Sequence, residues 1–167
     1  MTATVALNTA FISALSPHAT AHSALDEKPL SVDLTLPLPP RVRAYIYTLV
    51  EGRSDGRRDM KATLRVPGQV VGEYGSFDFS DSRYVLLMAY SATLDVFVLW
   101  DASLHQRFKH GGNIQVRPDT VFTAAATGTA RQLRRLKSGV NEIVLACRPS
   151  HLAETLVDRH ANTGARP

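Results

Sequence analysis

The sequence of 167 residues contains a single cysteine, Cys147, which excludes an internal disulfide framework and a zinc site built from several cysteines. It also lacks any apolar run approaching the roughly 20 residues that a membrane-spanning helix needs. The first 25 residues contain neither Lys nor Arg, so the basic start of a secretory signal peptide is missing. Together these absences predict a cytoplasmic protein that does not interact with a membrane.

The composition is that of a globular protein, with 44% hydrophobic and 20% charged residues. A chain of this length has room for one domain of ordinary size but not for two separate cores. We expect residues 1–30 to be an N-terminal appendage, residues 31–160 to form the folded body, and residues 161–167 to be a C-terminal tail.

Alternating or continuous apolar runs predict several strands. The pairs 42–50 with 60–66 and 83–90 with 94–100 are each separated by a short polar segment, which is typical of hairpins. Further strands are expected at 31–36, 113–117 and 140–147. Because strands dominate, we predict an α+β fold in which short helices flank a curved antiparallel sheet or a small β-barrel.

Helical patterns are fewer. One helix is expected near residues 6–15 and another at 152–160, where apolar residues gather on one side and Pro149 precedes the start. Asp101 and Asp119 are plausible N-caps of short helices, and residues 129–137 have a helical composition.

Positive charge is unevenly distributed. The net charge is +4, but residues 105–137 contain a single acid, Asp119. The bases of this segment are Arg107, Lys109, Arg117, Arg131, Arg134, Arg135 and Lys137. Such a segment favours polyanionic partners, because neutralising phosphates releases counterions. The alternative is an ordinary solvated basic face.

A search for convergent catalytic groups finds no persuasive site. Asp59 and Lys61 match the Asp-x-Lys pair of metal-dependent nucleases, but no partner carboxylate is evident nearby. His18 and His22 have a spacing that suits one face of a helix, yet no third metal ligand is indicated. Cys147 ends an apolar run and is expected to be a small buried side chain. We therefore predict neither an active site, a metal site nor a cofactor.

Four segments carry a resemblance to a known module. They are residues 72–78 (GEYGSFD), 96–101 (VFVLWD), 104–112 (LHQRFKHGG) and 147–152 (CRPSHL). Together they resemble the sulfur-binding domain of McrA-type, type IV restriction endonucleases, over residues 41–160. That family recognises double-stranded DNA whose backbone carries a phosphorothioate, and a separate HNH nuclease domain cuts it. The resemblance implies a non-catalytic recognition module of a bacterial defence system, because no HNH signature occurs in this sequence.

The resemblance also implies a set of site residues. A cavity for sulfur would be formed by Arg148, Pro149 and Leu152 from a proline-containing turn and by His105, Gln106 and Arg107 from a loop. Family members often have an aromatic residue where this chain has Arg148. Phosphate contacts would come from Lys109, His110 and Gly111, and candidate base contacts are Glu73, Tyr74, Ser76 and Arg83.

Physical reasoning agrees with this assignment. Phosphorothioate sulfur is larger and less strongly hydrated than phosphate oxygen, so an apolar notch with few donors should favour it. Pro149 offers a rigid ring without an N–H, and arginine stems can line a notch while their charged ends reach phosphate. Two alternatives stay open: a small metal-dependent nuclease using Asp59, Lys61 and Glu73 or Asp78, and a barrel-type module that binds RNA or base-modified DNA. The sequence does not indicate an oligomeric state.

Overall fold

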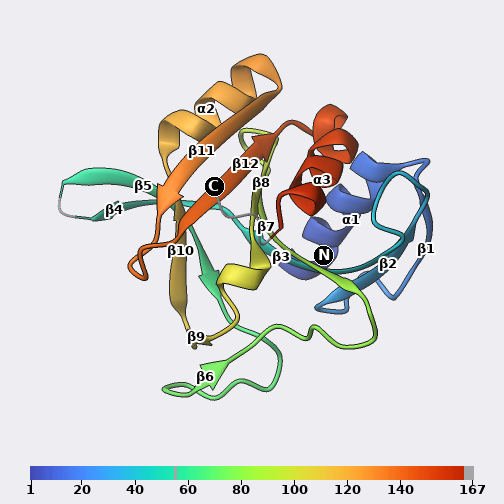
Figure 1. The fold of residues 1–167 in the computed structure, drawn as a ribbon, viewed down its shortest axis with the longest axis horizontal. Coiled ribbons are helices and arrows are strands. Elements are labelled where there is room, and N and C mark those ends of the chain that lie inside the picture. The colour runs from blue at the N-terminus through green and yellow to red at the C-terminus, as the bar shows by residue number, and fades with distance from the viewer. Residues whose placement is uncertain (55, 164–167) are drawn as a thin grey trace.

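A computed structural model describes residues 1–54 and 56–163, without the side chains of residues 53, 54 and 57 (Figure 1). Its helices are α1 (Ala3–Leu15), α2 (Pro118–Thr127) and α3 (Leu152–Ala161), with short 3₁₀ turns η1 (Ala102–Leu104) and η2 (Pro149–His151). Its strands are β1 (Ala19–His22), β2 (Leu30–Leu34), β3 (Arg41–Thr48), β4 (Val50–Ser54), β5 (Arg57–Leu64), β6 (Tyr74–Gly75), β7 (Tyr84–Ser91), β8 (Val96–Trp100), β9 (Phe108–Lys109), β10 (Gly112–Val116), β11 (Thr129–Arg135) and β12 (Asn141–Cys147).

A curved seven-stranded sheet in the order β1-β2-β3-β7-β8-β12-β11 forms the centre of the molecule. Its middle strands are buried on both faces, and β8 shows why their sequences are continuously apolar. Phe97 and Leu99 enter one hydrophobic core, whereas Val96, Val98 and Trp100 enter the other. Because side chains alternate between the two faces, a strand covered on both sides needs apolar residues at every position.

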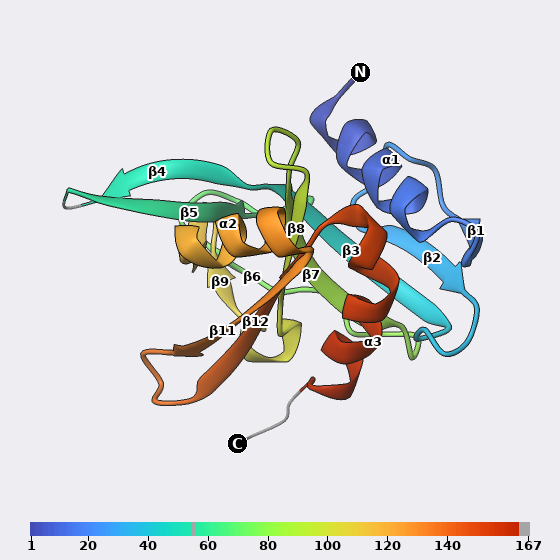
Figure 2. The same cartoon turned by 90° about the horizontal axis from the view of Figure 1, so that it is seen from above.

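Different elements cover the two faces of this sheet (Figure 2). Helices α1 and α3 pack against one face, to which they contribute Phe11, Leu15, Leu152 and Leu156. The other face is covered by α2 and by a second sheet in the order β10-β5-β4. A third, two-stranded sheet pairs β6 with β9 at one end of the molecule.

The first thirty residues contribute to the core. Leu7, Phe11 and Leu15 of α1 are buried, and Asn8 donates from Nδ2 to the carbonyl oxygens of Leu25 and Glu27 at 2.8 and 2.9 Å. These residues therefore pack against the body, although our sequence analysis treated them as an appendage. The domain boundaries themselves stay a prediction.

The α+β class and the curved sheet flanked by helices are confirmed. Of the two predicted architectures, the open sheet is the one observed, because β1 and β11 form its edges and no barrel closes among the described residues. The sheet is also not purely antiparallel, since β3 and β7 run parallel. The predicted hairpin 83–90 with 94–100 is present as β7–β8, whereas residues 42–50 divide between β3 and β4, of which only β4 pairs with β5.

One helix prediction is wrong. Residues 129–135 form strand β11, which pairs with β12 over its whole length from Thr129 opposite Cys147 to Arg135 opposite Asn141. Helical composition is a weak preference that pairing with a neighbouring strand overrides. The helix lies earlier, at Pro118–Thr127, and its N-cap is Arg117 instead of Asp119. The predictions of the last helix and of the Asp101 cap are confirmed, since Asp101 accepts from the Ser103 N–H at 3.0 Å.

Two predictions from the sequence concern membrane-spanning helices and the C-terminal tail. Among the described residues, none of the helices combines the length and the apolar character needed to cross a bilayer. Of the predicted tail, Ala161 is the last residue of α3, residues 162–163 follow it, and residues 164–167 lie outside the described part of the chain.

Candidate nucleic-acid interface

The small β6–β9 sheet presents two loops side by side. Tyr74 pairs with Lys109 and Gly75 with Phe108, so the segment around residue 74 and the basic loop after β8 become neighbours. Gln69 secures this arrangement, because its Nε2 donates to the carbonyl oxygens of Glu73 and Phe108 at 3.3 and 3.2 Å. A β-carbon on Gly75 would lie 2.6 Å from the Gln69 side chain, so any other residue there would displace Gln69 from this position.

Aromatic stacking anchors the same loops to the core. The rings of Phe77 and Phe108 are 4.7 Å apart between centroids, and Phe77 lies equally close to the ring of Tyr45 on β3. Both phenylalanines are buried, whereas Tyr74 on the neighbouring strand β6 is 51% exposed. A buried aromatic base therefore supports an exposed polar surface.

Tyr74 is the centre of a cationic surface, which we call the Tyr74 cluster: Tyr74, Arg107 and Lys109. The guanidinium carbon of Arg107 lies 3.8 Å from the centroid of the Tyr74 ring, and the Lys109 ammonium lies 5.8 Å from it. Both distances are within the range of cation–π attraction. All three side chains are exposed. In such an arrangement, an aromatic ring can stack on a nucleic-acid base, and the adjoining cations can contact neighbouring phosphates.

The other predicted residues of this loop lie beside the cluster. The His110 N–H donates to the carbonyl oxygen of Glu73 at 3.2 Å, and the Gly111 N–H donates to that of Leu64 at 2.9 Å. Gly111 has a φ of +77°, which favours glycine and turns the chain into β10. Ser76 is exposed immediately after Gly75. The structure therefore brings together the loop residues that the sequence analysis assigned to phosphate and base contacts.

His105 and Gln106, predicted to line the sulfur cavity, differ in their surroundings. His105 Nε2 lies 2.7 Å from Oε2 of Glu142, a carboxylate with no solvent exposure, and that oxygen also accepts from the Asp101 N–H at 3.1 Å. His105 thus holds the start of the basic loop onto β12. Gln106 is exposed.

The proline-containing turn is occupied by contacts within the protein. Arg148 donates to the carbonyl oxygen of Ala125 at 3.1 Å and forms a 3.5 Å ion pair with Asp95. Pro149 is half-buried at the start of η2, and Leu152 is fully buried in the core with α1. Leu152 therefore cannot line an open cavity in this structure.

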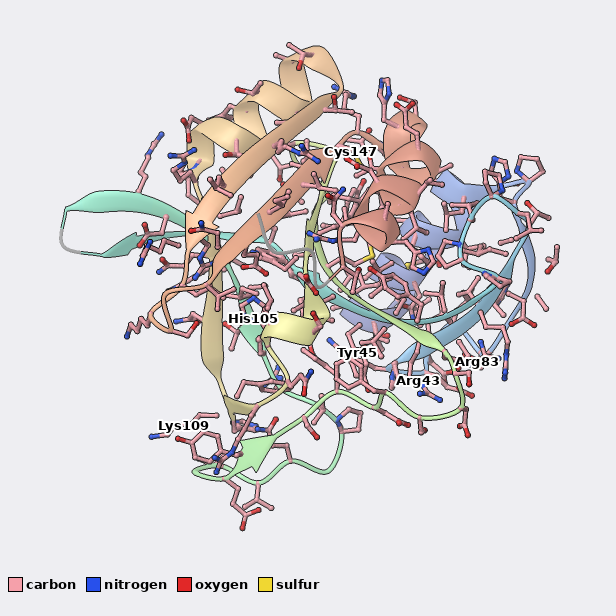
Figure 3. All side chains as sticks on the ribbon, in the orientation of Figure 1. Arg43, Tyr45, Arg83, His105, Lys109 and Cys147 are labelled. Carbon is pink, nitrogen blue, oxygen red and sulfur yellow. The ribbon has the colours of Figure 1, made fainter. Side chains whose placement is uncertain are left out.

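The two halves of the predicted sulfur cavity are separated. Strand β12 runs from Glu142, which holds His105, to Cys147, which directly precedes Arg148. These positions are five residues apart, about 17 Å along an extended strand. Figure 3 shows His105 and Cys147 at the two ends of β12. This structure therefore does not bring the two segments together, because strand register sends them to opposite ends of the β8–β12 pair, and a sulfur cavity built from both stays a prediction.

Arg83, a candidate base contact, lies elsewhere. Its Nη1 is 3.3 Å from Oδ1 of Asp33 and 3.3 Å from the carbonyl oxygen of Val42, so it joins β2 and β3 to the start of β7. Figure 3 shows Arg83 and Arg43 together, away from Lys109. Arg83 thus does not belong to the Tyr74 cluster.

The basic segment 105–137 is only partly available to a ligand. Arg117 pairs with Asp119 at 3.7 Å and Arg131 with Asp158 at 3.6 Å. Arg134 instead donates to the carbonyl oxygen of Gln115 on β10 at 2.6 Å. The remaining bases, which form no ion pair with any described residue, are Arg107, Lys109, Arg135 and Lys137.

The residues of the nuclease alternative are dispersed. Asp59 faces Gly52 near the start of β5, whereas Glu73 lies near Leu64 at its far end, again about 17 Å along the strand. Asp78 forms a 3.3 Å ion pair with Arg43, and hydrogen bonds from Ser80 hold the pKa of this carboxyl below its ordinary value. Among the described residues, His, Cys, Asp and Glu side chains form no group of three that could hold a metal ion.

Two further predictions about single residues can be compared with the structure. Cys147 is fully buried, and burial raises the pKa of its thiol to about 12, which agrees with a structural role. His18 and His22 do not share a helix face: His22 ends β1, and His18 Nδ1 lies 3.2 Å from the Thr35 hydroxyl.

Sequence reasoning missed Gln69 and Glu142, which position the two sides of the cluster. Neither has a local signal, because each acts on a segment that is remote in sequence: Gln69 on Phe108 and Glu142 on His105. A buried glutamate in the apolar run 140–147 was the nearest available indication, since a buried carboxylate requires partners.

Comparison with known proteins gives one family. The model of the family described as methylase-associated X1 matches residues 40–156, which include the Tyr74 cluster and the proline-containing turn. No curated protein and no solved structure matches the chain.

Proposed function

The chain belongs to the methylase-associated X1 family, and from this premise we propose that it is a DNA-binding module that reads a modified backbone. An association with methylases indicates a role related to restriction–modification. Within such a role, we propose that the chain recognises double-stranded DNA carrying a phosphorothioate and has no catalytic activity of its own.

The single observation that carries this proposal is the Tyr74 cluster. Arg107 and Lys109 adjoin one exposed aromatic face and form no ion pair with a described carboxylate, so both can pair with phosphates. Phosphate neutralisation supplies much of the affinity of proteins for DNA. Arg135 and Lys137, at the tip of the β11–β12 hairpin, would extend the contact to neighbouring phosphates.

The surroundings of the cluster support a preference for sulfur. The turn before Tyr74 exposes Val70 and Val71, which are 56% and 78% accessible, and the Glu73 N–H closes this turn onto the Val70 carbonyl oxygen. Exposed apolar side chains three and four residues before Tyr74 would accept a weakly hydrated sulfur at little desolvation cost, whereas oxygen would lose hydration without gaining a donor. One such atom is worth about 1–3 kcal/mol, or roughly 5- to 150-fold in affinity.

The proposal is tested by a gel shift that compares one duplex with and without a single phosphorothioate at physiological salt. We expect tighter binding of the modified duplex. We also expect Arg107→Ala to reduce the ratio of the two affinities about two- to fivefold, which corresponds to the energy of one exposed cation–π pair. Arg131→Ala is the matched control, because Arg131 is paired with Asp158.

Equal binding of both duplexes would overturn recognition of sulfur while leaving DNA binding intact. Competition of RNA or of a base-methylated duplex against the phosphorothioate duplex tests the alternative ligands, because the preferred ligand displaces the others at the lowest concentration. Incubating the complexes with Mg²⁺ or Mn²⁺ addresses the nuclease alternative: cleavage that depends on Asp59 would contradict a purely binding role, whereas retention without cutting agrees with it.

A further inference from the structure

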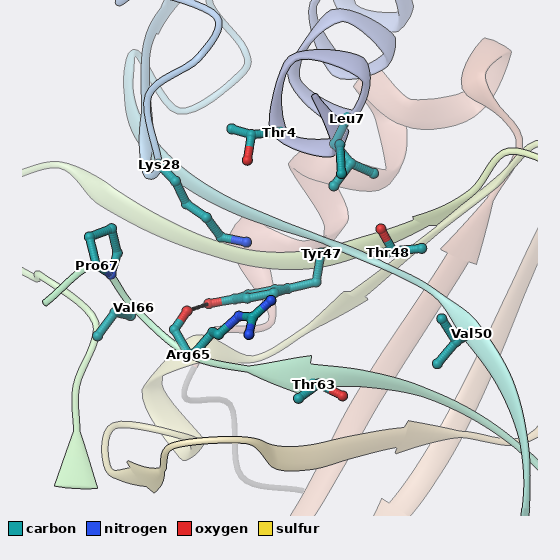
Figure 4. Close-up of a pocket in the computed structure, with 11 residues that line it drawn as sticks. Thr4, Leu7, Lys28, Tyr47, Thr48, Val50, Thr63, Arg65, Val66 and Pro67 are labelled. Carbon is teal, nitrogen blue, oxygen red and sulfur yellow. Dashed lines mark hydrogen bonds between the residues drawn. The ribbon is translucent and has the colours of Figure 1, made fainter. Parts of the chain in front are cut away.

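A second surface feature lies on the other side of the loop that precedes Tyr74. It is a pocket of about 480 Å³ between the start of α1, the end of β3 and the outer side of β5 (Figure 4). Two cations, Lys28 and Arg65, line it together with the Tyr47 ring. None of its described lining residues is acidic.

Lys28 is held in this pocket without a counter-charge. Its ammonium lies 3.6 Å from the centroid of the Tyr47 ring and donates to the Ile46 carbonyl oxygen at 3.2 Å. Neither Lys28 nor Arg65 pairs with a described carboxylate. Figure 4 shows both side chains directed toward the Tyr47 ring.

The protonation of Lys28 reflects these surroundings. Burial, and then the charge of Arg65, lower the pKa of its amine to about 8. A cation without an acidic partner is costly to bury, because it loses hydration. The hydrogen bond to Ile46 and the Tyr47 ring offset only part of that cost, as the lowered pKa indicates, and a bound anion would offset more of it.

The remaining lining residues limit the size and chemistry of the anion. Hydroxyl groups of Thr4, Thr48 and Thr63 supply hydrogen-bonding capacity, and the apolar side chains are those of Ala3, Leu7, Val50, Val66 and Pro67. The volume lies within the range of small-molecule sites and is larger than a bare phosphate requires. An anion that also carries an apolar ring would fill both parts.

We propose that this pocket binds a phosphate monoester of mononucleotide size, with Lys28 and Arg65 on the phosphate and the apolar wall against the rest of the ligand. The ligand is either a free nucleotide or the 5′-phosphorylated end of a nucleic-acid strand. The inference goes beyond the proposed function, because none of the pocket residues belongs to the Tyr74 cluster.

The test is isothermal titration of the whole chain with thymidine 5′-monophosphate, with thymidine, and with a short single strand that has either a 5′-phosphate or a 5′-hydroxyl. In at least one of these two pairs, nucleotide with nucleoside or 5′-phosphate strand with 5′-hydroxyl strand, we expect the phosphorylated compound to bind and the other to show no heat of binding. Lys28→Met and Arg65→Gln should each weaken that binding about tenfold, as loss of a charge-assisted hydrogen bond predicts. Arg131→Gln, on β11 and paired with Asp158, is the control.

A pH series adds a readout that a merely structural lysine would not affect. The charged or titratable groups facing Lys28 are Arg65, which directly follows β5, and Tyr47 from β3, whose pKa burial raises. The residues lining the pocket from α1 are not titratable. The phosphate is already a dianion above its second pKa of about 6. Affinity should therefore hold up to about pH 8 and fall as Lys28 loses its proton, and this fall should vanish in Lys28→Met.

The outcomes separate the possibilities. Binding of the monophosphate identifies a nucleotide site, and binding of only the phosphorylated strand identifies a strand-end site. Absence of binding at millimolar concentration, equal binding of the forms without phosphate, or binding that Lys28→Met leaves unchanged would each overturn the proposal. None of these results depends on Tyr74 or Arg107, so failure of this proposal would leave the proposed function, which the gel shift tests, unaffected.

Discussion

Two regions of this molecule contain similar residue types but differ in whether their arginine is free to bind a ligand. The Tyr74 cluster and the turn at Arg148–Pro149 each combine an exposed arginine with an apolar or aromatic ring. At the cluster, Arg107 lies over the Tyr74 ring and forms no ion pair with a described carboxylate. At the turn, Arg148 already donates to Ala125 and pairs with Asp95. A ligand at the turn must therefore displace existing contacts, whereas a ligand at the cluster need not.

The largest expected effect comes from reversing a charge in the cluster. Lys109→Glu should weaken binding of every duplex about 10- to 30-fold, because it removes a phosphate contact and adds repulsion, and it should reduce the slope of log affinity against log salt by about 1. Filter binding across a salt series measures both. Arg131→Glu makes the same change in net charge on a residue now paired with Asp158. Equal losses in both variants would mean that overall charge, not the cluster, governs affinity.

An intermediate effect is expected where the cluster is held to the core. His105→Ala would remove a hydrogen-bond partner from buried Glu142 and should lower the free energy of unfolding by about 1–3 kcal/mol. It should also reduce DNA affinity, because the loop that carries Arg107 loses its attachment. Chemical denaturation and the same binding assay measure the two effects, with exposed Gln106→Ala as the control. A loss of affinity without any loss of stability would instead indicate that His105 contacts DNA directly.

The smallest effect is expected at the turn. Pro149→Ala should leave the affinity for modified and unmodified duplexes within about twofold of the parent, because the turn follows the end of β12 opposite to Glu142, which holds the loop of the cluster. Competition gel shifts with the two duplexes are sensitive enough to measure this. A selective loss for the modified duplex would reverse the comparison and make Pro149 the wall against which sulfur rests.

Local patterns predicted most of the core correctly. The runs that became β7, β8 and β12 are apolar along their length because both faces of the central sheet are covered, and this requirement is visible in the sequence itself. The last helix was predicted for a similar reason, since its buried residues Leu152 and Leu156 recur at helical spacing. Residues 129–135 were mispredicted because their strand state depends on β12, a partner that composition does not reveal.

For the candidate site, the sequence by itself determined which residues are basic, apolar or aromatic, and it placed seven of the 19 Lys and Arg residues in one segment with a single acid. Only the tertiary structure decided which of these groups meet. Strand register separated the two halves of the predicted cavity, the β6–β9 pairing brought Tyr74 to Lys109, and ion pairs with Asp119 and Asp158 neutralised Arg117 and Arg131. The physical reason is range: hydrogen bonds and ion pairs act over a few ångströms, so whether a charge is free depends on neighbours that folding brings from distant parts of the chain.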